Sequence, residues 1–341
     1  MAKAIRASQA EIEAAVDALR DGELVAFPTE TVYGLGANAS NPAAVRKVFE
    51  LKGRPSSHPV IVHIDQRKYL KRWVRDVSPA AEKLAEAFWP GPLTLVLPRA
   101  DGVHDVVTGG QDTIAIRIPS HPMARQLLDA FGGGIAAPSA NRYGRLSATR
   151  AEHVEGEFGD AVKVILDGGE CQLGLESTIV SCLGDEVRLL RPGSITLGQL
   201  RNVVGEVAIG ADKTTPRVPG STAAHYAPGT PVTIVPGGEL DALAATLSEG
   251  GLRIAVLAQR LPLKTYETVT WINAGKRAEV FGHDLYANLR TLDKAGCTRI
   301  LVQEVPGDER WDAVRDRIAR AAASAVTDSG EYSALGTGVL P

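Results

Sequence analysis

The chain has 341 residues, of which 44% are hydrophobic and 23% charged, and its formal net charge is −3. This length predicts two domains, and no stretch approaches the roughly 18 to 20 consecutive apolar residues of a membrane-spanning helix. The N-terminal residues do not read as a secretory signal, and the three scattered cysteines (Cys171, Cys182 and Cys297) argue against a disulfide framework or a zinc site, so we expect a cytoplasmic protein.

Helices and strands alternate irregularly over the first 205 residues. A helix is predicted at 8–20, because Ser8 and Glu11 match a capping box and Ile12, Val16 and Leu19 recur on one face. Further helices are predicted at 42–51, from residue 79 and at 121–131. Strands are predicted up to residue 27 and at 59–64, 89–98, 112–120, 134–141, 162–169, 176–183 and 186–193. The pattern indicates one mixed α/β domain.

The composition changes after residue 205. Residues 206–230 are dominated by Gly, Pro, Thr and Ala, which predicts a linker. Beyond it, strands are predicted at 232–235, 253–257, 268–272 and 300–304, and helices at 240–247, 285–292 and 311–323. This alternation predicts a small Rossmann- or flavodoxin-like α/β sheet. We therefore expect a larger domain at 1–205, a linker at 206–230 and a smaller α/β domain at 231–341.

The stretch FPTETVYGLGANA (27–39) contains the dinucleotide pattern G-x-G-x-x-A. A dinucleotide fingerprint follows its strand directly, opens a helix and has an acidic residue about 20 positions later. Here six residues separate Phe27 from Gly34, the helix opens later at Pro42, and KGRP stands where the acid belongs. The sequence thus argues against a Rossmann fingerprint and leaves a polar turn, which is either ordinary turn chemistry or part of a binding site.

Residues 46–75 carry nine lysines and arginines but only two acids, Glu50 and Asp65, in a chain whose overall charge is negative. A solvated helix face around Leu70, Trp73 and Val74 would explain this run without a ligand. Attraction of an anion, either phosphate groups or RNA, explains it equally well.

Polar residues also gather where other elements end. KGRP (52–55) places two cations on a loop stiffened by Pro55, which suits phosphate or carboxylate recognition, although a helix C-terminus also favours cations. His63 lies in a strand, where a histidine is usually satisfied by its neighbours. The hydroxyl and amide residues of APSANRYGRLS (137–147) and ESTIV (176–180) could cradle a nucleotide. The sequence has no G-x-S-x-G motif, which argues against an acyl-enzyme.

Taken in order, these motifs resemble the L-threonylcarbamoyl-AMP synthases with their YrdC-type catalytic domain. The motifs are PTETVYGLG (28–36), KGRP (52–55), HPVIVHI (58–64), TIAIRIP (113–119), APSAN (137–141) with Ser147, ESTIV (176–180) and LRPG (190–193). They cover nearly all of the first 205 residues. HYAP (225–228) and the additional α/β domain resemble the long, two-domain form.

The resemblance implies an ATP-dependent reaction. L-Threonine and bicarbonate would form an N-carboxylated threonine, whose new carboxylate attacks the α-phosphate of ATP to give L-threonylcarbamoyl-AMP and pyrophosphate. Magnesium would accompany ATP. A partner transferase would pass the threonylcarbamoyl group to the adenosine beside the anticodon of tRNA, with at most a weak contact between tRNA and this chain and with no membrane involved. Such chemistry needs positioning and charge neutralisation rather than a covalent nucleophile.

The resemblance also implies site residues, by motif position. L-Threonine would be bound by Thr31, His63, Arg117, Ala137 and Ser177. ATP would be held by Arg54, His58, Thr113, Ser139, Ser147, Arg191, His225 and Tyr226. Lys52 and Arg54 would be catalytic, with Lys52 near the triphosphate or bicarbonate. The resemblance identifies no metal ligands.

Two features leave alternatives open. The linker reads PGSTAA (219–224), where long-form members often carry basic residues, so His225 and Tyr226 would carry the contact to ATP. The second domain has no evident site cluster and would support a lid or dock a partner. The alternatives are a non-catalytic RNA-binding module, suggested by the basic segment 67–75, and a related carbamoyl-transferring enzyme, against which the chain length and scattered cysteines argue.

Overall fold

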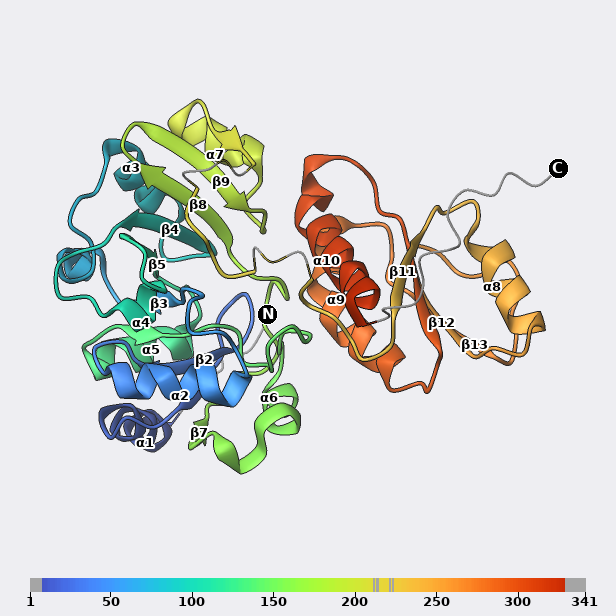
Figure 1. Cartoon of the computed structure of the whole chain (residues 1–341), viewed down its shortest axis with the longest axis horizontal. Helices are drawn as coiled ribbons and strands as arrows, with labels where there is room; N and C mark the ends of the chain where they lie inside the picture. Colours follow the sequence, from blue (N-terminus) through green and yellow to red (C-terminus); the bar gives the residue numbers. More distant parts are fainter. Residues whose placement is uncertain (1–7, 211, 213–214, 221, 223, 329–341) are drawn as a thin grey trace.

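The computed structural model describes residues 8–328, apart from 211, 213, 214, 221 and 223. It has a larger part and a smaller part, drawn in blue to yellow and in orange to red in Figure 1. The residues before Ser8, and two positions of the PGSTAA sequence, lie outside the described residues. Among the described residues no helix is both long and apolar enough to cross a membrane, and the three cysteines are free thiols.

The larger part contains a mixed set of helices and strands. Its helices are α1 (Gln9–Arg20), α2 (Pro42–Lys52), η1 (Arg67–Arg72), α3 (Pro79–Phe88), α4 (Asp105–Thr108), α5 (Pro122–Phe131), α6 (Ala151–Phe158), η2 (Gly159–Ala161) and α7 (Leu197–Val204). Its strands are β1 (Val25–Phe27), β2 (Gly34–Asn38), β3 (Ile61–His63), β4 (Leu93–Pro98), β5 (Thr113–Arg117), β6 (Ile135–Ala136), β7 (Val164–Ile165), β8 (Thr178–Leu183), β9 (Glu186–Arg191) and β10 (Ala208–Ile209).

Local signals set the helix boundaries as the sequence predicts. Ser8 and Glu11 form the capping box of α1. Asn41 accepts hydrogen bonds from the first backbone amides of α2, and Gly53 ends that helix in the left-handed conformation (φ 64°). The predicted mixed α/β domain is confirmed, although several strands are shorter than predicted because turns and prolines interrupt the pairing.

The larger sheet is mixed and has the strand order β10-β9-β8-β4-β5-β3-β6-β2-β1-β7. Strand β10 lies within residues predicted to form only a linker, so the sheet continues into that segment. Strands β3 and β5 are parallel and β4 and β5 antiparallel, which places His63 opposite Arg117 and Arg117 opposite Thr94. The register therefore brings polar residues from separate motifs into one row across the sheet.

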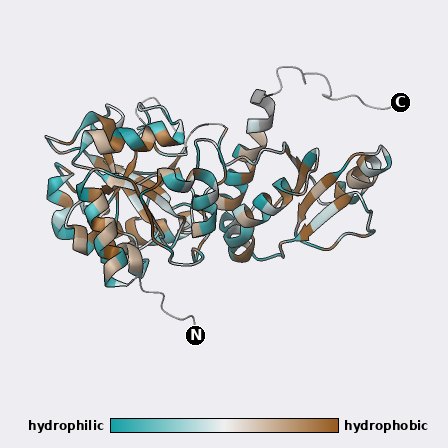
Figure 2. Ribbon diagram, turned by 90° about the horizontal axis from the view of Figure 1, so that it is seen from below, coloured by the Kyte–Doolittle hydropathy of each residue, from teal (hydrophilic) through white to brown (hydrophobic). Residues whose placement is uncertain are grey.

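Figure 2 shows hydrophobic segments, in brown, in the interiors of the two parts. In the larger part, hydrophobic residues cover both faces of the strands nearest the polar turn. Val25 and Phe27 pack in a core cluster with helices α1 and α5, whereas Ala26 between them packs in the cluster that includes α2. A smaller cluster on β3, β5 and β8 contains the linker residue Val218. The linker therefore covers this part of the sheet.

The smaller part has a parallel sheet in the order β11-β14-β12-β13. Its elements are β11 (Val232–Val235), α8 (Leu240–Glu249), β12 (Ile254–Ala258), β13 (Val269–Asn273), α9 (Ala278–Asp293), β14 (Arg299–Gln303), η3 (Glu309–Trp311) and α10 (Asp312–Asp328). This confirms the predicted small α/β sheet. Helix α9 begins seven residues before the predicted start, and it includes Gly282, a residue that weakens helix prediction.

The two parts share one hydrophobic cluster. Val32, Leu146 and Leu175 of the larger part pack in the same cluster as Tyr226 of the linker and Phe281 of α9. Gly282 makes this contact close, because a Cβ atom would lie 3.1 Å from the Leu175 side chain and 3.2 Å from the Val314 side chain. Helices α9 and α10 face the larger part in Figure 1. The second domain is therefore packed against the motif-bearing domain through apolar side chains.

Candidate active site

The polar turn between β1 and β2 is buried and internally hydrogen-bonded. Thr29, Glu30 and Thr31 are each at most 2% exposed. The Thr29 hydroxyl donates to the carbonyl of Val32 at 2.6 Å and accepts from the backbone amides of Thr31 and Val32, both at 3.2 Å. The turn therefore has a defined shape that local hydrogen bonds maintain.

Arg117 connects this turn to the sheet. Its Nη2 lies 2.6 Å from Glu30 Oε1, and its Nη1 donates to the Thr31 hydroxyl at 2.8 Å. The side chains of both ionic partners are less than 5% exposed. The guanidinium that the motif comparison assigns to threonine thus also orders the turn, and Glu30 balances its charge in the interior.

A cavity lies between the polar turn, the sheet and the linker. Most of the site residues implied by motif position line it together, although they come from elements far apart in the sequence. These residues are Thr31, Arg54, His63, Arg117, Ala137, Ser139, Ser177, Arg191, His225 and Tyr226. The cavity is also lined by residues that no motif assignment named, which include Thr29, Tyr33, Ile61, Glu176, Pro219 and Gly220.

Four other assigned residues lie outside this lining. Lys52 is buried, and its amine donates to the carbonyls of Ser139, at 2.6 Å, and of Asn141. It therefore ties the end of α2 to the loop that contributes Ser139 to the cavity. Burial, and secondarily the charge of Arg54, lowers the pKa of Lys52 well below its usual value.

The remaining three assigned residues occupy different places. Ser147 donates its hydroxyl proton to Glu176, directly behind the cavity wall. His58 lies beside Tyr143, whose hydroxyl is 3.3 Å from His58 Nδ1. Thr113 begins β5, at the opposite end of the strand from Arg117. The cavity lining does not include these residues, and their assignment to ATP stays a prediction.

The linker forms one wall of the cavity through His225 and Tyr226. Tyr226 has a positive φ of 59°, which is uncommon for a residue other than glycine. A Cβ atom at Gly220 would lie 2.1 Å from the Tyr226 hydroxyl, so this position requires glycine for space as well as for its own φ of 76°. The ring centroids of His225 and Tyr226 lie 4.1 Å apart, and those of His225 and Tyr143 lie 5.6 Å apart.

The cavity wall carries an excess of positive charge. Arg54, Arg117 and Arg191 are all buried there, together with the carboxylate of Glu176. Although burial raises the pKa of Glu176, the charges of Arg317 and Arg191 lower it to about 2. Burial lowers the pKa of Arg54 to about 10, so Arg54 keeps its charge at neutral pH.

Several polar atoms of this region lack a hydrogen-bond partner within the described residues. They include Arg54 Nε, His225 Nδ1 and Asn141 Oδ1. Because buried polar groups are normally paired, such atoms around a cavity indicate a site for a polar ligand. Among the described residues that line the cavity, no hydroxyl is hydrogen-bonded to a histidine, so an activated serine or threonine nucleophile is not formed there.

His63 should make the fold more sensitive to acid. Burial, and secondarily Arg117, lowers its pKa to about 3, whereas an unfolded histidine titrates near pH 6.5. In the unfolded chain His63 therefore binds a proton below about pH 6.5, whereas in the folded chain it stays neutral down to about pH 3. The free energy of unfolding consequently decreases as the pH falls below about 6.5. We expect the unfolding free energy of the wild type to drop by about 2 kcal/mol more than that of H63Q between pH 7 and pH 5.

Urea unfolding of both proteins at the two pH values measures this difference. The comparison uses the change with pH in each protein, so that a general destabilisation by the substitution cancels. Equal pH dependence in the two proteins would show that His63 is not held neutral by the fold.

Sequence reasoning missed residues that approach the site from the second domain. Tyr286 of α9 and Arg317 of α10 both bond to Glu176. Arg317 was detectable in principle, because it lies on the same face of a predicted helix as the apolar residues Val314, Ile318 and Ala321. A cation on an apolar helix face requires a buried partner, but the sequence does not indicate which residue that partner is.

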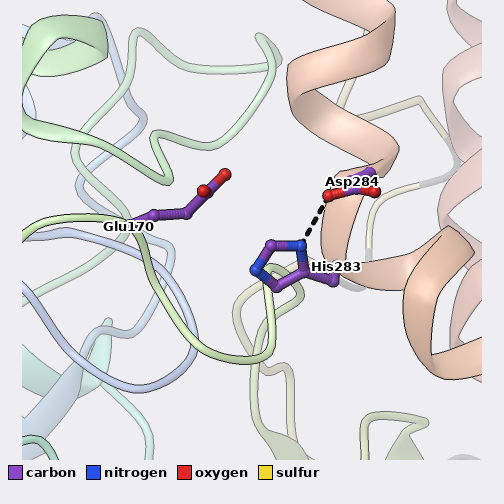
Figure 3. A group of neighbouring side chains, drawn as sticks. All are labelled: Glu170, His283 and Asp284. Carbon is purple, nitrogen blue, oxygen red and sulfur yellow. Dashed lines mark hydrogen bonds and ion pairs between the residues drawn. The ribbon is translucent and has the colours of Figure 1, made fainter. Parts of the chain in front are cut away.

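A group of potential metal ligands lies at the seam between the two parts. Figure 3 shows Glu170 of the larger part facing His283 and Asp284 of α9. The His283 ring is hydrogen-bonded to Asp284 at 2.6 Å, and Glu170 is paired with Arg150 at 2.9 Å. Each of these bonds lies within one part, so the potential ligand atoms already have protein partners on their own side of the seam.

The fold and the cavity together define an α/β protein with a cavity lined by buried arginines, whose charge suits an anionic ligand. A family model described as "Telomere recombination" matches residues 17–193, and one described as "Threonylcarbamoyl-AMP synthase, C-terminal domain" matches residues 195–323. The chain is 38% identical to a threonylcarbamoyl-AMP synthase of Pyrococcus abyssi (93% of this chain, 95% of that protein) and 40% identical to one of Bacillus subtilis (93% and 94%).

The structure agrees with these matches. It is similar to the crystal structure of P. abyssi Sua5 complexed with L-threonine, with a TM-score of 0.88 and 37% identity over 94% of this chain and 96% of that one. The chain belongs to the threonylcarbamoyl-AMP synthase family, in its two-domain form. The resemblance carried by the motifs is therefore confirmed, and the protein is an enzyme rather than a non-catalytic RNA-binding module.

Proposed function

We propose that this enzyme makes L-threonylcarbamoyl-AMP from L-threonine, bicarbonate and ATP, with release of pyrophosphate. The observation that carries the proposal is the cavity itself, in which three buried arginines and several hydroxyls from separate motifs surround unpaired polar atoms. A site of this kind suits reactants that are all anionic or carry a carboxylate. The solved relative complexed with L-threonine supports threonine as one of them.

L-Threonine would bind at the row formed by the polar turn and the sheet. Arg117, held in place by Glu30 and Thr31, would attract its carboxylate from the cavity side. The neighbouring residues would surround its side chain and amino group, with His63 neutral at physiological pH. These neighbours are Thr31, His63, Ala137 and Ser177.

ATP would lie along the cationic wall towards the linker. Arg54 and Arg191 would contact its phosphates, and Ser139 would offer a hydroxyl. Lys52 would contribute by fixing the carbonyls of residues 139 and 141, or by direct contact if the loop opens. His58, Thr113 and Ser147 would join the nucleotide site when the linker residues His225 and Tyr226 make room.

The reaction would proceed by in-line attack of the N-carboxythreonine carboxylate on the α-phosphorus. The new carboxylate–phosphorus bond forms as the bond to pyrophosphate breaks, and the electron pair leaves with pyrophosphate. The arginines would stabilise the charge that develops on the phosphate oxygens. Magnesium would enter with ATP and be held mainly by the phosphates, because the cavity carboxylate Glu176 is already paired with Arg317.

The product would be consumed by a transferase that modifies the adenosine beside the tRNA anticodon. The exposed basic segment 67–75 of this chain offers a surface for a weak contact with tRNA. This contact would be secondary to the synthase activity.

Pyrophosphate release by the purified full chain tests the proposal. The assay contains ATP and magnesium, with threonine and bicarbonate omitted in turn, and the nucleotide product is identified by its mass. We expect release that requires both reactants and a product with the mass of threonylcarbamoyl-AMP. Release without threonine would indicate another acid substrate or an ATPase, and no release in any mixture would contradict the proposed reaction.

A further inference from the structure

Glu176 at the cavity receives most of its hydrogen bonds from the second domain. Arg317 Nε donates to Oε2 at 2.7 Å, and the Tyr286 hydroxyl lies 3.1 Å from Oε1 and 3.0 Å from Oε2. From the larger part, the Ser147 hydroxyl donates to Oε1. Glu176 is 6% exposed, and the Arg317 side chain is fully buried. The second domain thus determines where this carboxylate lies.

Arg317 is linked to the cavity by two further contacts. Its Nη2 donates to the carbonyl of Pro192 at 3.1 Å, next to Arg191 of the LRPG motif. Its guanidinium carbon lies 5.0 Å from the ring centroid of Tyr226, a linker residue that lines the cavity. A single side chain of α10 therefore contacts the ESTIV motif, the LRPG motif and the linker at once.

Movement of Glu176 would be transmitted directly to residues assigned to the substrates. Ser177 follows it in the chain, and the Ser177 carbonyl accepts hydrogen bonds from Arg191 at 2.8 and 3.2 Å. The Ser147 hydroxyl is oriented by its bond to the Glu176 carboxylate. A shift of about 1 Å in groups that position a substrate can reduce turnover by a factor of about 100.

We propose that Arg317 and Tyr286 are positioning residues of the active site, through which the second domain holds Glu176 and thereby places Ser147, Ser177 and Arg191. This inference rests on the proposed reaction for its kinetic consequences. It assigns the second domain a part in building the catalytic cavity, in addition to any role in docking a partner.

The substitution R317M in the full chain tests the assignment, with R315M as the matched control. Arg315 lies on the same helix but bonds to Asp312 and to the carbonyl of Pro306, at the surface. We expect R317M to lower kcat/KM for ATP or threonine by about tenfold to a hundredfold, whereas R315M stays within twofold of the wild type. Y286F, which keeps the ring, should cause a smaller loss in the same parameters.

A pH profile separates positioning from a general effect on packing. The charged or titratable groups around Glu176 are Arg191, His225, Tyr226, Tyr286 and Arg317. Asp316 lies next to them and is ion-paired with both Arg317 and Arg320. Without Arg317, Glu176 should accept a proton at higher pH, so the deficit of R317M should grow as the pH falls from 8 to 5. The double variant R317M/E176Q has no carboxyl group at position 176, and Asp316 keeps its ion pair with Arg320, so the double variant should lose that additional pH dependence.

The unfolding free energy, measured in urea from pH 5 to 8, gives a readout that does not depend on activity. R317M should show an added proton linkage that R317M/E176Q lacks. If R317M is unstable, R317K, which keeps the charge but not the guanidinium geometry, and Y286F supply the kinetic comparison in milder form. Wild-type kinetics and pH dependence in a folded R317M, or wild-type kinetics in both R317K and Y286F, would overturn the proposal. Failure of the wild type to release pyrophosphate would instead contradict the proposed reaction.

Discussion

Replacing Arg117 with methionine is expected to lower the free energy of unfolding by about 3 to 5 kcal/mol and to abolish threonine-dependent pyrophosphate release. Arg117 and Glu30 form a buried ion pair at 2.6 Å, with side chains that are 4% and 3% exposed. Removing the cation leaves the Glu30 carboxylate in the interior without its counter-charge, which is strongly unfavourable. Thr31 also loses a hydrogen-bond donor. Urea unfolding at pH 7 and the pyrophosphate assay measure the two effects.

Two further variants identify the cause of the loss. R117M/E30Q removes both charges, so it should recover more than half of the lost stability while remaining inactive. T31V retains the ion pair, so its stability should stay within about 1.5 kcal/mol of the wild type while its KM for threonine rises. A loss of less than 1 kcal/mol in R117M would mean that Glu30 finds another partner or takes up a proton.

Replacing Arg54 with methionine is expected to reduce kcat/KM for ATP by about 100-fold to 1,000-fold without destabilising the fold. Arg54 is 7% exposed, and its Nη2 donates to the carbonyl of Pro59 at 2.8 Å. Its Nε has no hydrogen-bond partner in the described part of the chain. Because an uncompensated buried cation is unfavourable until an anion binds, the folded protein should be as stable, or more stable, without it.

Steady-state kinetics and thermal unfolding of R54M and R46M test this separation of activity from stability. Arg46 is an exposed cation on α2 and controls for the general loss of positive charge from this segment. We expect R46M to retain nearly wild-type kinetics. Equal losses in the two variants would indicate a diffuse electrostatic effect, and a parallel loss of stability in R54M would indicate a structural role for Arg54.

Short-range signals predicted most of the elements. Ser8 with Glu11, and Asn41 with Pro42, mark helix starts that the structure has at the same places, because capping groups act within a few residues. Strand β2, helices α4 and α7, strand β10 and the first half of α9 were not predicted. Strand β10 is only two residues long, β2 contains two glycines, and Gly282 weakens helix prediction in α9 although it packs closely against Leu175.

The candidate site was only partly predictable. Motif positions named residues such as Thr31, Arg54 and His63, which do line one cavity. They did not indicate that Arg117 is paired with Glu30 or that Lys52 bonds to backbone carbonyls, since both depend on the distances between separate segments. Sequence spacing alone carries no information about these distances.

The sequence by itself determined most of the longer helices, the polar turn and the motifs that identify the family, because each depends on residues close together in the chain. Only the tertiary structure decided that Arg317 and Glu176, 141 residues apart, share a buried ion pair at the cavity. That contact exists because the apolar surfaces of the two domains pack together and exclude water around it. A buried charge must then find its partner within the packed interface, and this requirement cannot be read from local sequence.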